Sequence, residues 1–151
     1  MMTGMSLRAA VTLVSAAILS MGCLLGQQCS TAAQAGDYVM TCDGYVTIVG
    51  AATLIPTKVL SSVNVTSGGT FTGTGTASLG GKILSATLSG TGSVNSNCTG
   101  SVLLAQTVGG QTAPSLSANV AVSDSGNTID ALVTVPNFVL SCRLKRLAAG
   151  Q

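Results

Sequence analysis

The five cysteines, Cys23, Cys29, Cys42, Cys98 and Cys142, are the residues of this sequence best able to do chemistry. No two of them form a C-x-x-C pair and the chain has no histidine. A zinc site would therefore need four scattered thiolates, and a catalytic thiol would lack its usual base. If Cys23 leaves with a leader peptide, an even number remains, which in an exported chain indicates disulfide bonds. Spacing alone does not choose among the three possible connectivities.

The acidic side chains offer little for catalysis, because the chain has only four aspartates and no glutamate. Asp124-Ser125-Gly126 resembles the D-S/T-G element of aspartic proteases, whose chemistry needs two carboxylates that share a proton. A hairpin turn explains this segment more simply. The missing histidine excludes a Ser-His-Asp triad, and no S-x-x-K spacing surrounds Lys58 or Lys82. We predict that the protein is not an enzyme and has no catalytic residues, metal or cofactor.

The formal net charge is +2, and only 7% of the residues are charged. Nucleic-acid binding proteins normally show a basic stripe with interleaved aromatic residues. The one basic cluster here is Arg143, Lys145 and Arg146, which fits the solvent-facing side of a strand. We therefore expect no nucleic-acid partner.

The N-terminus has the features of a secretory signal. Arg8 precedes an apolar stretch over residues 9–19, and small residues follow at Ser20 and Gly22. We expect a signal helix within residues 1–26 and one domain over residues 27–151, with cleavage before Cys23, Gln27 or Gly36. The stretch is too short for a stable membrane span. A lipid anchor on Cys23 is disfavoured, because Ser20 stands where lipoboxes usually carry leucine. The expected location is secreted, periplasmic or at the cell surface.

The rest of the chain consists of short β-prone runs separated by turn residues. Alternation with period two is clearest towards the C-terminus, where one face is apolar and the other polar. A bulge at Asp43-Gly44 would join the first two runs, and Gly109-Gly110 with Pro114 indicate a longer loop. Glycines at Gly73, Gly75, Gly90 and Gly92 favour close backbone packing or strand curvature. Strands are expected over residues 37–42, 45–49, 58–66, 70–79, 82–94, 98–106, 116–123, 128–135 and 138–147.

This pattern predicts an all-β domain, a single antiparallel meander closed into a barrel of about eight strands. Closure would make the first and last strands neighbours, which makes a Cys42–Cys142 disulfide geometrically reasonable. Cys29 would then pair with Cys98. Each bond would close a long loop of the unfolded chain.

A barrel of this size either fills its interior or holds one small ligand. We expect a non-catalytic protein that binds a small apolar molecule, lined by Tyr38, Met40, Phe138 and Leu140. The alternative is a structural or surface-interaction protein with a filled core, whose Ser/Thr-rich outer faces form the working surface.

Several segments resemble a group of small exported bacterial proteins of unknown function, which are expected to form calycin-like (lipocalin-like) barrels. The group carries a G-x-Y opening, a G-x-F-x-G hairpin and a V-N-x-x-C-T-G segment. The resemblance spans about residues 28–146 and implies the barrel fold and an exported location. It implies no catalytic residue. Gly92 stands where the group tends to have an aromatic residue, and Cys42 and Cys142 look like additions to it. The matching segments are Gln28-Cys29, Gly36-Asp37-Tyr38, residues 68–73, residues 88–95 and Cys98-Thr99-Gly100.

Overall fold

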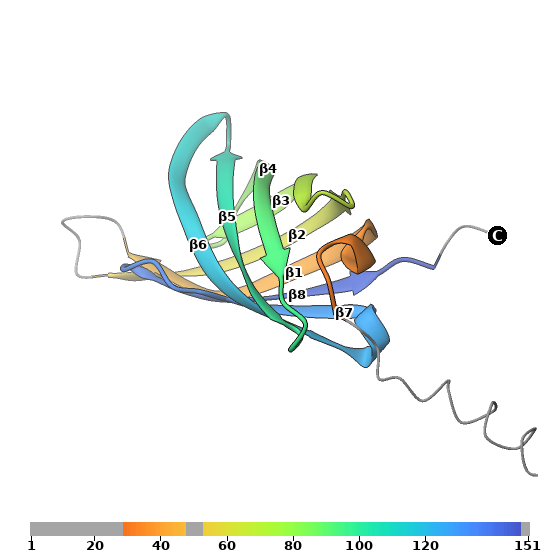
Figure 1. Ribbon diagram of the computed structural model, residues 1–151. Helices are drawn as coiled ribbons and strands as arrows, with labels where there is room; N and C mark the ends of the chain where they lie inside the picture. The colour runs from red at the N-terminus through yellow and green to blue at the C-terminus, as the bar shows by residue number, and fades with distance from the viewer. Residues whose placement is uncertain (1–28, 48–52, 149–151) are drawn as a thin grey trace, which may run out of the picture.

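The structure is a computed structural model that describes residues 29–47 and 53–148 (Figure 1). The expected signal helix, Cys23 and the last two residues of the strand expected over 45–49 lie outside the described residues. Within the described part, eight antiparallel strands form one sheet that closes in the order β1 to β8. This confirms the all-β barrel that the alternation predicts. The strands are β1 (Gly36–Thr47), β2 (Leu54–Val65), β3 (Thr70–Leu79), β4 (Lys82–Val94), β5 (Thr99–Val108), β6 (Gln111–Ser123), β7 (Thr128–Val133) and β8 (Phe138–Arg146).

Pairing between β1 and β8 closes the barrel. The ladder runs from Tyr38 opposite Arg146 to Val46 opposite Phe138, and it places Cys42 directly opposite Cys142. A closed ladder leaves no unpaired sheet edge, so the barrel removes the main aggregation hazard of an isolated sheet. The first and last strands therefore lie side by side, as the sequence predicts.

The interior face follows the period of two. On β6, Leu116, Ala118, Val120 and Val122 are buried, and the residues between them are exposed. On β1, Tyr38 is fully buried at one end of the same apolar interior. Inward apolar residues alternating with outward Ser, Thr and Asn explain how a chain with few charges gives the barrel an apolar interior and a polar outer face.

Two predicted interruptions are wrong. The register of β1 with β2 runs without a shift through Asp43 and Gly44, so this strand has no bulge there. Gly109 and Gly110 form a tight turn with positive φ angles, so β6 begins at once and Pro114 lies within it. The irregularity falls instead between Leu104 and Gln106 of β5. Proline donates no ladder hydrogen bond, which explains why the pairing slips beside Pro114.

Inward-facing glycines let the strands bend towards one another. A Cβ atom at Gly75 of β3 would overlap the backbone oxygen of Leu60 and lie 2.6 Å from the Cα of Ser61. At Gly90 of β4 a Cβ would overlap the backbone oxygen of Leu103. These positions oppose a neighbouring backbone too closely for any side chain, which supports the predicted role in curvature. The strong bend of β5 and β6 is visible in Figure 1.

Candidate ligand cavity

An apolar cavity of about 110 Å³ lies inside the barrel. All eight strands contribute to its wall, and among the described residues around it none is charged. An engineered protein cavity of about 150 Å³ with apolar walls holds benzene, so this space suits a molecule of roughly that size. One wall residue from each strand in order is Met40, Val63, Phe71, Leu88, Leu104, Val120, Ile129 and Leu144.

The segment that precedes β1 contributes to one end of the cavity. It contains the 3₁₀ helix η1 (Ala32–Gln34), and Thr31 and Gln34 both line the cavity. The Thr31 hydroxyl accepts a hydrogen bond from the backbone N–H of Val94 at 3.0 Å. The segment is therefore joined to the last residue of β4.

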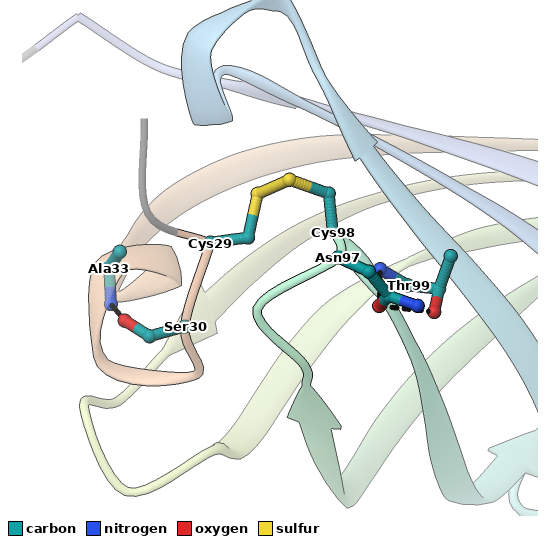
Figure 2. Close-up of a disulfide and its surroundings, with 6 residues drawn as sticks. All are labelled: Cys29, Ser30, Ala33, Asn97, Cys98 and Thr99. Carbon is teal, nitrogen blue, oxygen red and sulfur yellow. Dashed lines mark hydrogen bonds between the residues drawn. A yellow bond between two sulfur atoms is a disulfide. The ribbon is translucent and has the colours of Figure 1, made fainter. Parts of the chain in front are cut away.

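A disulfide between Cys29 and Cys98 fixes the same segment to the turn between β4 and β5 (Figure 2). Cys98 has a φ of 65°, a left-handed conformation that a non-glycine residue adopts only under local constraint. The side-chain oxygen of Asn97 accepts hydrogen bonds from the N–H and the hydroxyl of Thr99, which helps to order this turn. The N–H of Val122 donates to the backbone oxygen of Cys98 at 2.8 Å and ties the turn to β6.

Tyr38 and Arg146 also fix η1, through hydrogen bonds to its backbone oxygens. The buried Tyr38 hydroxyl donates to the backbone oxygen of Gln34 at 2.9 Å. Arg146 donates from Nε and Nη2 to that hydroxyl, at 3.1 and 2.7 Å, and from Nη2 to the backbone oxygen of Ala33 at 2.7 Å. This network joins the first strand, the last strand and the preceding segment at one end of the barrel.

The Gln34 side chain is the least satisfied polar group at the cavity. The residue is only 3% exposed, and neither amide atom has a hydrogen-bond partner among the described residues. Buried amides nearly always find a partner, so such a group in a cavity wall calls for an explanation. Its side chain is the longest polar one in the cavity wall.

The four side chains expected to line a ligand site do not gather around one cavity. Met40 lines it. Tyr38 and Leu140 are buried and Phe138 is half-buried, but none of these three is among its wall residues. Leu140 and Phe138 lie near the start of β8, towards the opposite end of the barrel from η1.

All four cysteines of the expected domain form disulfides in the expected pairs. Cys42 is joined to Cys142 across the β1–β8 ladder, and Cys29 is joined to Cys98. The prediction of two disulfides is therefore confirmed. Cys142 also contributes to the cavity wall.

Sequence reasoning missed Gln34 and Thr31. They precede the first strand in a run of small residues, so no alternation places their side chains inside or outside. The only local signal is a long polar side chain between two alanines, and the same three residues also fit a signal-cleavage pattern. Their role depends on the contacts of this segment with β4 and with the turn that follows it, and local sequence does not predict such contacts.

Ser61 provides a stability test that is separate from the cavity wall. Its side chain is buried on the inner face of β2, and its hydroxyl has no hydrogen-bond partner among the described residues. We expect Ser61→Ala to raise the free energy of unfolding by about 1 kcal/mol, because it removes an unpaired buried hydroxyl. Urea denaturation measures this, with the exposed neighbour in Ser62→Ala as the matched control. A loss of stability in Ser61→Ala alone would show that the hydroxyl is paired in solution.

Within the described ranges, no helix is both long and apolar enough to span a membrane. The same part of the chain holds no cluster of three or more His, Cys, Asp or Glu side chains suited to a metal ion. No protein-family model, no curated protein and no solved structure gives a significant match to this chain. The fold and the cavity therefore define the class directly: a small disulfide-bonded, closed antiparallel β-barrel with an apolar interior cavity.

Proposed function

We propose that this is an exported, non-catalytic barrel protein that holds a small, mostly apolar molecule in its interior. The observation that carries the proposal is the cavity itself, with walls from every strand and no charged side chain among the described wall residues. Ligand sites in proteins are typically concave and apolar, with a few placed polar groups. The volume of about 110 Å³ is below the roughly 300–1,000 Å³ of pockets for drug-sized ligands, so it restricts the ligand to a molecule of about the size of benzene.

Export is supported by the disulfides and by the leader-like N-terminus. Disulfides persist in oxidising compartments and are rare in the cytosol of most organisms.

The segment before β1 bears on where a signal peptidase would cut. Cleavage before Gly36 would remove Cys29, Thr31 and Gln34, which all belong to the cavity end. We therefore place cleavage before Cys29, so that the mature chain keeps this segment.

The absence of catalysis is supported by the positions of Asp43 and Asp130. Asp43 accepts a hydrogen bond from Lys58 at 2.5 Å, and Asp130 accepts one from Arg143 at 2.7 Å. Both pairs are exposed on the outer surface, and the Asp43 partner raises the pKa of the Lys58 ammonium. Carboxylates that are paired on the outside of the barrel do not converge on the cavity.

A large exposed apolar patch would favour the alternative, a surface-interaction protein. Most large apolar side chains that are exposed on the outer face are separated by polar ones, and the exception is Tyr45 opposite Val139. Leu60 lies between Thr41 and Thr76 on the neighbouring strands. Leu132 lies between Asn119 and Ser141. Single exposed apolar residues of this kind are normal on soluble proteins.

The proposal is tested by native mass spectrometry on protein purified from the cells that produce it. We expect a fraction of the protein to carry a small adduct that denaturing conditions release, and a mature chain with two disulfides and no lipid. Denaturing spectra with and without reductant should differ by the mass of four hydrogens. A lipid on Cys23, or adduct-free protein that also binds no small apolar probe, would contradict the proposal.

A further inference from the structure

The amide of Gln34 is a hydrogen-bonding group placed in an otherwise apolar cavity wall. The side chain is buried, it lines the cavity, and its oxygen and nitrogen have no partner among the described residues. Leaving a buried amide unpaired costs about 1–3 kcal/mol. Methionine or leucine would cover the same wall without that cost, so the amide needs a function or a partner.

The backbone that carries the amide is held at several points. Tyr38 donates to the oxygen of Gln34 itself, and Arg146 donates to the oxygen of Ala33. The backbone N–H of Gln34 donates to the oxygen of Thr31, and Thr31 is bound in turn to Val94. A polar group on such a rigid segment is pre-organised to recognise a ligand.

We propose that Gln34 binds the polar head of the ligand. This inference rests on the proposed function of the cavity. A carboxamide offers one acceptor oxygen and two donor hydrogens. The complementary head both donates and accepts, as a hydroxyl or a primary amide does. The ligand is therefore a small amphipathic molecule: an apolar body against the strand side chains and one hydrogen-bonding head at η1.

The head is uncharged. No charged side chain is among the described wall residues. Arg146 is not a wall residue, and the groups that its Nε and Nη2 contact, on Tyr38 and Ala33, are not in the wall either. A buried carboxylate or ammonium would lose its hydration without gaining a counter-charge, which is strongly unfavourable.

The test compares three probes of similar size on the full disulfide-bonded chain: toluene, benzyl alcohol and benzoate at pH 7. Dissociation constants are measured by ligand-observed NMR for the unmodified protein and for Gln34→Met, which keeps the length of the side chain but removes the amide. We expect Gln34→Met to weaken benzyl alcohol roughly tenfold while toluene binds at least as well. Ser61→Ala, which removes an unpaired buried hydroxyl that is not in the cavity wall, should change neither constant.

Each other outcome overturns part of the proposal. If Gln34→Met changes the dissociation constants of toluene and benzyl alcohol by the same factor, the amide makes no contact with the head. Tighter binding of benzoate than of benzyl alcohol would exclude the neutral head. If the unmodified protein binds both toluene and benzyl alcohol and Gln34→Met leaves both dissociation constants unchanged, the cavity function stands and the assignment of Gln34 falls. If no probe binds at all, the cavity function falls as well. Urea denaturation of ligand-free Gln34→Met separates binding from folding, because we expect that variant to be no less stable.

Discussion

Removal of the Cys42–Cys142 disulfide is expected to lower the free energy of unfolding by about 2–5 kcal/mol. The bond joins residues 100 positions apart and links the two strands that close the barrel. In the chain-entropy model a bond across so long a loop removes many conformations from the unfolded chain. Small domains have a total stability of only about 5–15 kcal/mol, so this loss is a large part of it.

The measurement is the urea midpoint of the Cys42→Ala, Cys142→Ala double variant against the unmodified protein. Cys29→Ala with Cys98→Ala is the matched variant, since it opens a loop of 69 positions at the end of the barrel that carries η1. We expect a similar loss of stability there, and weaker benzyl alcohol binding because this bond fixes the segment that carries Gln34. An unmodified protein whose urea midpoint is unaffected by reductant would contradict the role given to both bonds.

Gly75→Ala is expected to cost at least about 3 kcal/mol of unfolding free energy or to prevent folding. A methyl group at this position overlaps the backbone oxygen of Leu60, and a backbone atom within a paired strand cannot move aside as a side chain can. The strands would have to separate at this point, which breaks ladder hydrogen bonds and opens the barrel wall.

Gly68→Ala is the matched control, because the nearest atom to a Cβ there is the Thr66 hydroxyl oxygen at 3.9 Å. In thermal unfolding, the midpoint temperature of Gly68→Ala should be close to that of the unmodified protein, and the midpoint of Gly75→Ala should be far lower. Adding Ser61→Ala should not rescue Gly75→Ala, since the backbone oxygen and not the Ser61 hydroxyl is the main obstacle. Rescue by that second change, or equal stability of the two glycine variants, would show that the barrel wall is looser than the structure indicates.

The sequence predicts the barrel well because its main determinant is local. Alternating apolar and polar residues indicate which face of each strand is inward, and turn residues indicate where the chain reverses. Cys42 and Cys142 fall on the first and last strands, so closure and disulfide pairing support each other.

Features that depend on neighbouring strands are not predictable in the same way. Pro114 indicates a loop by its own propensity, but it is tolerated within β6 because the irregularity of the β5–β6 ladder lies beside it. Asp43-Gly44 indicates a bulge, but Gly44 is needed because the backbone of Val139 on β8 comes too close for any Cβ. Gln34 belongs to this group too, since its place in the cavity wall follows from η1, Tyr38 and Arg146 together.

The central claim is that the interior cavity accepts a small molecule, and methyl NMR tests it most directly. The protein is labelled at the methyl groups of leucine, valine and isoleucine and titrated with toluene. We predict saturable shifts at Val63, Leu88 and Val120, which line the cavity, and none at the exposed Leu60, Ile83 and Leu132. Shifts confined to the exposed methyl groups, or no shift at any methyl group up to the solubility limit of toluene, would contradict the claim.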